Sequence, residues 1–597
     1  MLPYAPFLVW LLPLVASALM PLAALHPKVR DLFPVVVGFV TAAFALSMIP
    51  DVSAGPPYPN PQISWLLVPG LIEVKVGVLL DPLSVFMCNI VAGIGSLILL
   101  YSLAYMAGEE GITRYWFFML LFIGSMIGLV VADNFLWLYI FWEMVGLCSY
   151  ALIGFWYKKP EARKAGVKAF IVTRIGDVFF LAGIILIFLN TGSFAFSDLK
   201  GTLEAFKVLP CALSTVPFLL LLGAIGKSAQ LPLHVWLPDA MEGPTTVSAL
   251  IHAATMVKAG VYLMARTHLI YMEAAPEAWL TALIWVGAIT AFLTATMGLT
   301  AVDIKRVLAY STISQIGYMM MALGLGASAG FVFISQFHLM SHAIFKALLF
   351  LAAGVIIHSL AGLRDMRKMG GLWRDAPVTF YTMVVGVLAL GGVPPFNGFW
   401  SKDLIFAAAL ETGNYAALFL AVVTAALTLA YGLRMIYLTF LGEKRSEEVK
   451  KMHIHEPWVM RVPLLILATL CFITGFTGEN FAGFMGVLTH NGEVFHVEPL
   501  SVSLSIVALL VGGIPAYLVY WKRSPPPENF ARGGWGALQR LLSEGYYFDK
   551  FYYAVFVDGL KAAVQGFRKT HPGILNFNIS LILGGLLLLA FLLLMLG

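Results

Sequence analysis

Long apolar runs separated by short polar loops recur along the whole chain. Sixteen runs are long enough to cross a bilayer, near 3–25, 33–50, 82–107, 114–132, 134–157, 167–190, 212–238, 243–266, 279–300, 305–325, 331–360, 377–408, 414–441, 461–484, 500–521 and 574–596. A membrane-spanning helix needs about 20 apolar residues at a rise of about 1.5 Å each. The pattern therefore predicts an all-α polytopic membrane protein with about sixteen transmembrane helices.

Lysine and arginine are distributed unevenly between the predicted loops. Loops after odd-numbered spans, up to the thirteenth, hold eighteen of them, whereas loops after even-numbered spans hold four. Loops rich in lysine and arginine stay on the cytoplasmic side of a membrane. We therefore expect the odd loops in the cytoplasm, both termini outside, and a multi-pass location in the inner (plasma) membrane of a prokaryote.

Two of the predicted spans are interrupted by proline and glycine. The seventh contains Pro232 and Pro238, and the twelfth contains the stretch GGVPPFNG. Irregular backbone at membrane depth survives only inside protein or beside a water-filled cavity. A lysine lies near each break, Lys227 and Lys402. Matched breaks in two halves of a chain indicate an internal repeat and an ion pathway.

The segment between the last two spans has a different character. Residues 526–573 mix charged side chains with Leu, Phe and Tyr at helical spacing. This pattern predicts an amphipathic helix on the cytoplasmic surface. A soluble loop with one short helix is the alternative.

Composition excludes several other classes of protein. The chain is 60% hydrophobic and 12% charged, with a mean hydropathy of +0.88, whereas soluble domains carry about 25% charged residues. A net charge of +5 over 597 residues gives no reason to expect a nucleic-acid partner. The four cysteines form no C-x-x-C or Cys/His cluster. We therefore expect no iron–sulfur centre, metal site or disulfide framework on this chain.

Ionisable side chains inside the predicted spans are the candidate functional residues. They are Glu143, Asp177, Lys227, His252, Lys258, His338, His342, Lys346, Lys402 and Asp403. A charged group at the bilayer centre costs roughly 2.5–3.5 kcal/mol on insertion scales. These groups must therefore face one another or water. Carboxylates, lysines and histidines in series can each hold a proton and pass it on, which predicts a proton relay.

The positions of four of these residues in the sequence predict more specific roles. His338, His342 and Lys346 recur every four residues and share one helix face. Glu143 is the one charge in a run of 23 residues, 135–157. Its movement towards a buried lysine could change the lysine pKa by about 3 units, or roughly 4 kcal/mol. We therefore expect Glu143 to be the switchable partner of Lys227.

Structural alternatives remain open for some residues. Asp177 lies near a predicted helix end and Asp403 follows Lys402, so either could belong to a structural ion pair. We expect Lys305 and Arg306 to extend to the cytoplasmic interface.

Several ordered motifs resemble one family. FWEMVGLCSYALIGFWY, TRIGD, GKSAQLPLHVWLPDAMEGP, HAIFKALLF and PPFNGFWSKD are similar to motifs of the antiporter-like subunit L (chain 5) family of proton-pumping NADH–quinone oxidoreductases, complex I. Large subunits of sodium/proton antiporters and membrane-bound hydrogenase subunits are relatives of it. The resemblance implies a central proton-transfer axis at Glu143, Lys227, Lys346 and Lys402. It implies that Asp177, His252, His338, His342 and Asp403 support this axis.

The resemblance also implies a domain organisation. Residues 1–110 would hold three helices, 111–275 and 276–442 two inverted five-helix repeats, 443–525 two further helices, 526–573 the lateral segment and 574–597 the last helix. Iron–sulfur clusters, flavin and quinone would lie on partner subunits, both membrane and peripheral, with no cofactor on this chain.

Two features depart from complex I. The lateral segment is short, and Lys258 resembles the antiporter and hydrogenase relatives. These features leave the electron donor open between NADH, an F420-type cofactor and ferredoxin. We expect a proton-translocating subunit driven by redox chemistry on other chains. The alternative is the large subunit of a sodium/proton antiporter or of a membrane-bound hydrogenase.

Overall fold

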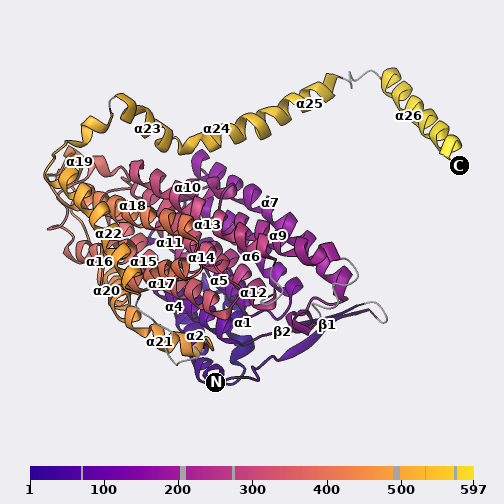
Figure 1. The fold of residues 1–597 in the computed structure, drawn as a ribbon, viewed down its shortest axis with the longest axis horizontal. Helices are drawn as coiled ribbons and strands as arrows, with labels where there is room; N and C mark the ends of the chain where they lie inside the picture. Colours follow the sequence, from indigo (N-terminus) through magenta and orange to yellow (C-terminus); the bar gives the residue numbers. More distant parts are fainter. Residues whose placement is uncertain are drawn as a thin grey trace. The chain divides into compact units, whose positions relative to one another are not determined.

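The chain folds almost entirely into helices (Figure 1). The computed structural model describes residues 1–68, 72–201, 210–271, 276–487, 498–531, 533–569 and 575–596. Twelve helices in these ranges are long and apolar enough to cross a membrane. The predicted all-α membrane fold is confirmed. The sequence analysis missed one antiparallel hairpin, β1 (Gln62–Val68) and β2 (Ile72–Gly77), which lies between the second and third spans.

Each of the sixteen predicted spans contains at least one helix. The first eight hold α1 (Ala5–Ala23), α2 (Pro27–Ser47) with α3 (Ile49–Ser53), α4 (Pro82–Tyr105), α5 (Ile112–Val131), α6 (Phe135–Ile153), α7 (Pro160–Thr191), α9 (Pro210–Lys227) with α10 (Trp236–Asp239), and α11 (Thr245–Ala253) with α12 (Met256–Tyr271). The others hold α13 (Glu277–Thr300), α14 (Ile304–Gly324), α15 (Ala329–Ser359), α16 (Pro377–Gly391) with α17 (Asn397–Glu411), α18 (Tyr415–Phe440), α20 (Trp458–Ile473) with α21 (Gly478–Phe484), α22 (Pro499–Ala516) and α26 (Leu575–Leu596). The short helices α8 (Phe196–Gly201) and α19 (Glu447–Lys451) lie in loops.

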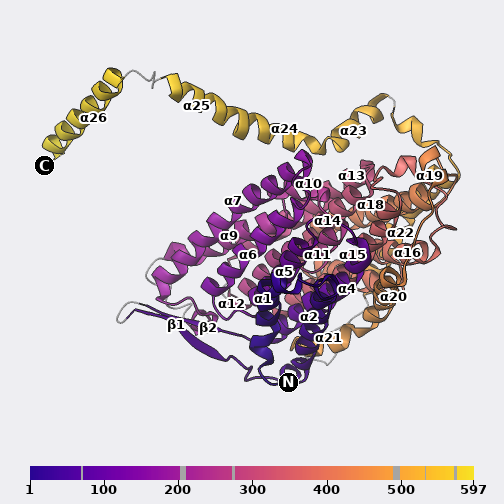
Figure 2. The same cartoon turned by 180° about the vertical axis from the view of Figure 1, so that it is seen from behind.

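Odd and even loops lie at opposite ends of the helices, as their charges predict. Arg364, after the eleventh span, pairs with Glu242 at 2.9 Å and Asp303 at 3.2 Å, which follow the seventh and ninth spans. At the other end, a backbone bridge joins Val78 to Ala132, after the second and fourth spans. The N-terminus lies at the hairpin end, away from α19, in both views (Figures 1 and 2). We call the end that carries the odd loops the basic end.

Both predicted helix breaks are present. The helix α9 ends at Lys227, and irregular turns precede α10. In the twelfth span α16 ends at Gly391 and α17 begins at Asn397. Gly398 has no room for a side chain, because a Cβ there would lie 1.7 Å from the Ala389 carbonyl oxygen. The absence of a side chain therefore allows the two half-helices to pack closely.

A third break, between α11 and α12, was not predicted. The helix stops at Ala253, and the Thr255 hydroxyl donates to the Leu250 carbonyl at 2.8 Å. No proline or glycine marks this point in the sequence HAATMVK. The break separates His252 from Lys258, two of the candidate residues.

Helices pair in a corresponding way in the two halves of the body. In the first half α5 packs on α6, α7 on α9 and α9 on α12, and in the second α13 packs on α14, α15 on α16 and α16 on α18. The halves meet where α11 and α12 pack against α14 and α15. Among the candidate spans in the described residues, Thr245–Tyr271 and Ala329–Ser359, which contain α11, α12 and α15, are the most deeply buried. The residue boundaries of the repeats stay a prediction.

Residues Phe530–Gly597 form a separate unit. It contains α23 (Gly533–Ser543), α24 (Phe548–Tyr552) and α25 (Gly559–Lys569), and helix continues without interruption from Phe548 to Lys569. Leu560, Val564 and Phe567 are exposed on one face of α25. The predicted amphipathic helix is therefore confirmed. Residues 532 and 570–573 of the lateral segment lie outside the described residues.

An ion pair near the hairpin end ties α4 to α12. Asp81 accepts from the Ser84 backbone nitrogen at 2.9 Å, which caps α4, and from Arg266 Nη2 at 3.0 Å. We expect Asp81→Asn to destabilise the protein, because breaking a buried pair costs about 3–5 kcal/mol. Heat inactivation of the purified assembly should shift to lower temperature. In the matched control, Asp51→Asn removes a more exposed ion pair with the N-terminus; equal shifts in the two variants would contradict this role of Asp81.

Candidate functional site: a line of buried ionisable side chains

Glu143 forms an ion pair with Arg174, not with Lys227. Glu143 lies on α6 and Arg174 on α7, and their side chains are 22% and 37% exposed on the flank of the bundle. The Tyr139 hydroxyl interacts electrostatically with Glu143 and with Arg174. Glu143 and Lys227 are therefore not paired in this structure, and the role of Glu143 as the switchable partner of Lys227 stays a prediction. Arg174 was not among the predicted residues, because the TRIGD motif was expected near a helix end, whereas α7 extends over 32 residues.

Lys227 is instead paired with Asp177, deep in the protein. Lys227 Nζ lies 3.1 Å from Asp177 Oδ2, and neither side chain is exposed. Trp142 Nε1 donates to the other carboxylate oxygen at 2.5 Å. The helices α7 and α9 approach closely at Gly176, where a Cβ would lie 2.8 Å from the Leu222 carbonyl oxygen. This close approach brings Asp177 within reach of Lys227.

The two ion pairs are neighbours. Arg174 and Asp177 are three residues apart on α7 and therefore share a helix face. On α6, Trp142, which binds Asp177, directly precedes Glu143. Two carboxylates and two cations thus alternate within one or two helical turns.

Three further lysines are buried without a carboxylate partner. Lys258 donates to the Leu339 carbonyl at 2.9 Å and Lys402 to the Leu390 carbonyl at 2.6 Å. Lys346 donates to the Leu308 carbonyl at 3.1 Å and to the Ser311 hydroxyl. In the described ranges no Asp or Glu lies within ion-pair distance of these amines. Backbone carbonyls and one hydroxyl, not an opposite charge, therefore hold these three amines.

Three histidines lie among these lysines. His342 interacts electrostatically with Lys258, Lys346, His338 and His252. His338 Nδ1 lies 2.9 Å from the Ser401 hydroxyl. Neither ring nitrogen of His252 or of His342 has a hydrogen-bond partner among the described side chains and backbone. Buried polar groups of this kind are the ones that ordered water satisfies, so the cluster suits proton transfer through water.

Asp403 lies at the far side of the cluster and does not pair with Lys402. Its two carboxylate oxygens accept from the Ser501 and Ser505 hydroxyls of α22, each at 3.1 Å. The neighbouring Lys402 points instead to the end of α16. The alternative of a Lys402–Asp403 ion pair is therefore wrong.

Lys305 is a functional candidate that sequence analysis placed at the interface. It is only 2% exposed, and its amine donates to the Met241 and Gly243 carbonyls at 2.7 Å each. Irregular backbone after α10 presents these carbonyls and needs a donor. The expectation that Lys305 extends to the interface was wrong, whereas Arg306, 45% exposed, fits it.

Packing of the helices arranges the groups in a line across the body. Neighbours in this line pack pairwise: α6 on α7, α7 on α9, α9 on α12, α12 on α15, α15 on α17, and α17 on α22. The line thus runs from Glu143 through Lys227, Lys258 and His342 to Lys402. No cluster of three metal-ligating side chains occurs in the part of the chain that the structure describes.

Known proteins are similar to this chain over most of its length. Residues 132–428 match the family model described as NADH:quinone oxidoreductase/Mrp antiporter, TM, and residues 65–116 match complex I, chain 5 N-terminus. The chain is 38% identical to NAD(P)H-quinone oxidoreductase chain 5 of Synechocystis sp., covering 87% of this chain and 84% of the relative. It is 42% identical to F(420)H(2) dehydrogenase subunit L of Methanosarcina mazei, covering 82% and 79%.

Solved structures share the fold. The Mrp complex from Dietzia sp. contains a chain that matches with a TM-score of 0.81 at 27% identity over 99% of this chain, which spans 63% of that chain's length. An archaeal membrane-bound sulfane sulfur reductase matches with a TM-score of 0.80 at 23% identity over 98% of this chain and 99% of that chain, a likeness of fold alone. The alignments with the relatives and the line of buried charges lead to one conclusion: the chain belongs to the NADH:quinone oxidoreductase/Mrp antiporter family of membrane subunits.

Proposed function

We propose that this chain is the proton-translocating membrane subunit of a complex I-like oxidoreductase. Redox chemistry on other subunits would drive protons along the line from Glu143 to Lys402. The observation that carries this proposal is a series of buried lysines and histidines, which have no carboxylate partner among the described residues, next to two neighbouring ion pairs. Relatives named as oxidoreductase subunits support the redox-driven reading.

Exchange of ion-pair partners gives a mechanism for the proton movement. When Arg174 leaves Glu143 and approaches Asp177, Lys227 loses part of its counter-charge. Lys227 then releases its proton towards the central cluster, where an amine or imidazole that carries no proton accepts it. Successive transfers through Lys258, His342 and Lys346 bring a proton to Lys402. When Arg174 returns to Glu143, the Lys227–Asp177 pair forms again. Lys227 can then accept another proton.

The free energies of the proposed steps are consistent with this mechanism. Moving one charge against 100 mV requires about 2.3 kcal/mol. Changing a lysine pKa by about 2 units changes its proton free energy by roughly 2.7 kcal/mol. Loss of an opposite charge within about 4–6 Å shifts a pKa by 1–3 units. Partner exchange at Lys227 can therefore supply the energy for one step.

Partners and orientation follow from the same proposal. Iron–sulfur clusters, flavin and the quinone site would lie on peripheral and membrane partner subunits. The basic end would face the cytoplasm of a prokaryotic cell, with both termini outside, as the positive-inside rule requires. The line from Glu143 to Lys402 would then run parallel to the membrane.

Glu143 gives a direct test of the ion-pair step. We expect Glu143→Gln to reduce proton pumping strongly, because a neutral amide cannot hold Arg174 away from Asp177. Glu143→Asp keeps the charge and should retain part of the pumping. Proton uptake by proteoliposomes with the intact complex measures both. A fully active Gln variant would show that charge at position 143 is irrelevant.

A sodium/proton antiporter subunit is the alternative function, which the match to the Mrp complex favours. Affinity purification of this chain from mildly solubilised membranes distinguishes the two. Iron–sulfur absorbance and quinone-reducing subunits in fixed ratio would support the redox-driven pump and name the electron donor. Small hydrophobic partners without redox centres would support the antiporter.

A further inference from the structure

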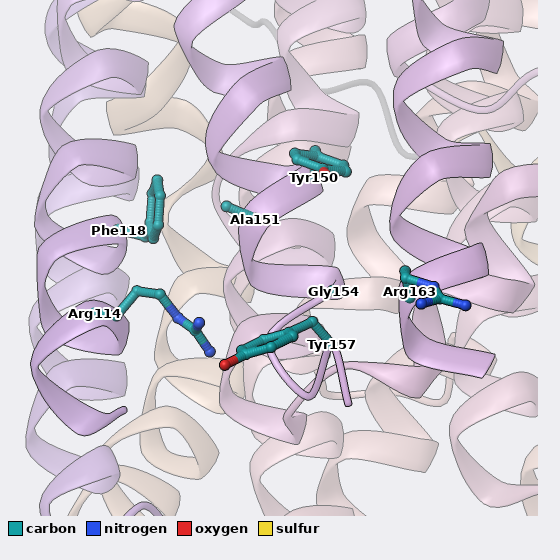
Figure 3. A pocket seen from close by; sticks show the side chains of 7 residues that line it. All are labelled: Arg114, Phe118, Tyr150, Ala151, Gly154, Tyr157 and Arg163. Carbon is teal, nitrogen blue, oxygen red and sulfur yellow. The ribbon is translucent and has the colours of Figure 1, made fainter. Parts of the chain in front are cut away.

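A cavity of about 160 Å³ lies outside the line of buried charges, where α5, α6 and α7 reach the basic end. Arg114 and Arg163 lie on either side of Tyr157, with Phe118 and Tyr150 on the membrane side (Figure 3). Arg114 belongs to the first turn of α5 and Arg163 to the first turn of α7. The cavity is therefore a basic pocket at the level of the membrane surface.

Both guanidinium groups have donors to spare. Arg114 Nη2 donates to the Phe155 carbonyl at 2.8 Å, and its guanidinium lies 4.8 Å from the centre of the Tyr157 ring. No carboxylate among the described residues lies within ion-pair distance of Arg114 or Arg163. A guanidinium carries five N–H donors, so the one hydrogen bond of Arg114 to the Phe155 carbonyl leaves most of its donors available to solvent or a ligand. Two guanidinium groups that line one pocket, without a carboxylate partner in the described ranges, make it a favourable site for an anion.

An apolar surface continues from the pocket into the membrane. Leu147 and Tyr150 on α6 are 47% and 40% exposed, and Val167 and Ile171 on α7 are 41% and 55% exposed. On α6 this face passes from Tyr150 to Glu143 in two helical turns, about 10 Å. A ligand with an anionic head and apolar chains matches both the pocket and this surface.

We propose that the cavity binds the headgroup phosphate of an anionic glycerophospholipid, whose acyl chains lie along the exposed face of α6 and α7. Arginine pairs bind phosphate oxygens through two parallel hydrogen bonds. Tyrosines favour the headgroup level, and basic pockets between helices on the cytoplasmic side bind anionic lipid heads. The bound chains would cover the partly exposed Glu143–Arg174 pair and exclude water from it.

Lipid binding to the intact, delipidated complex tests this proposal. Phosphatidylglycerol is added in neutral detergent, and native mass spectrometry follows its binding to the wild type and to the Arg163→Gln variant. Arg163 is exposed, and its side chain makes no hydrogen bond within the described part of the chain, so this variant should assemble. The Lys164→Gln variant is the matched control, since it removes an exposed cation next to the cavity but not from its lining. Phosphatidylcholine and inorganic phosphate are added as competitors.

We expect Arg163→Gln to bind phosphatidylglycerol about tenfold more weakly, the effect of losing a charge-assisted hydrogen bond, and Lys164→Gln to bind it normally. Arg163→Lys should recover part of the affinity. Equal binding by the wild type and Arg163→Gln would overturn the proposal. Displacement by inorganic phosphate at the same concentration would assign the pocket to free phosphate. If the Arg163→Gln complex lost a neighbouring subunit but bound lipid normally, the pocket would be assigned to a protein carboxylate. Displacement by phosphate and loss of a subunit would each contradict a lipid site.

Discussion

Replacing Lys227 by methionine is expected to abolish proton pumping and to destabilise the protein. The substitution leaves Asp177 buried without a counter-ion, and breaking a buried pair costs about 3–5 kcal/mol. Asp177→Asn should have a similar effect, because it leaves the buried amine of Lys227 without its partner. Proton uptake in proteoliposomes and the temperature of heat inactivation measure the two consequences separately.

The double variant Asp177→Asn/Lys227→Met separates a functional pair from a structural one. Neutral side chains of similar size in place of both charges often restore stability. We therefore expect heat stability to return towards the wild-type value while pumping stays lost, because neither new side chain can hold the transferred proton. Recovery of pumping in the double variant would mean that the pair only supports the fold.

Replacing Lys402 by alanine is expected to uncouple electron transfer from proton pumping while the complex still assembles. Its amine makes a single hydrogen bond, to the Leu390 carbonyl at 2.6 Å, and has no ion-pair partner in the described ranges. Loss of such a hydrogen bond costs only about 1 kcal/mol, so the half-helices should keep their positions. A relay that lacks its last buried amine cannot complete the transfer.

Two measurements check the Lys402→Ala variant. The subunit composition of the purified complex should match the wild type, and the quinone reduction rate with a protonophore present should stay substantial. Proton uptake should be lost. The control is Arg306→Ala, which removes an exposed cation of the same chain and should pump normally. Wild-type pumping by Lys402→Ala would exclude Lys402 from the pathway.

Hydropathy and charge along the sequence were sufficient to predict much of this fold. Each predicted span holds a helix because burial in a bilayer imposes a long apolar run on every crossing. Proline and glycine identified the breaks beside Lys227 and Lys402, because both residues disfavour continuous helix. The break between His252 and Lys258 stayed hidden, since a threonine hydroxyl and not a proline makes it.

Residue types identified the candidate site, but not its pairings. A buried lysine needs a partner or a neutral state, so Lys227 and Lys346 stood out from the sequence alone. The choice between Glu143 and Asp177 as the partner of Lys227 depended on the length of α7 and on the close approach of α7 and α9 at Gly176. Both depend on tertiary packing, which periodicity along one chain does not contain. Lys305 was misplaced for the same reason, because its acceptors lie on a distant loop.

The ratio of protons taken up to electrons transferred tests the central claim most directly. It is measured in proteoliposomes that contain the intact complex with either the wild-type chain or the Asp177→Asn/Lys227→Met chain, which should be comparably stable. The account predicts a ratio near zero for the double variant, because proton uptake is lost while electron transfer continues in the presence of a protonophore. An unchanged ratio would show that protons do not pass through these buried side chains.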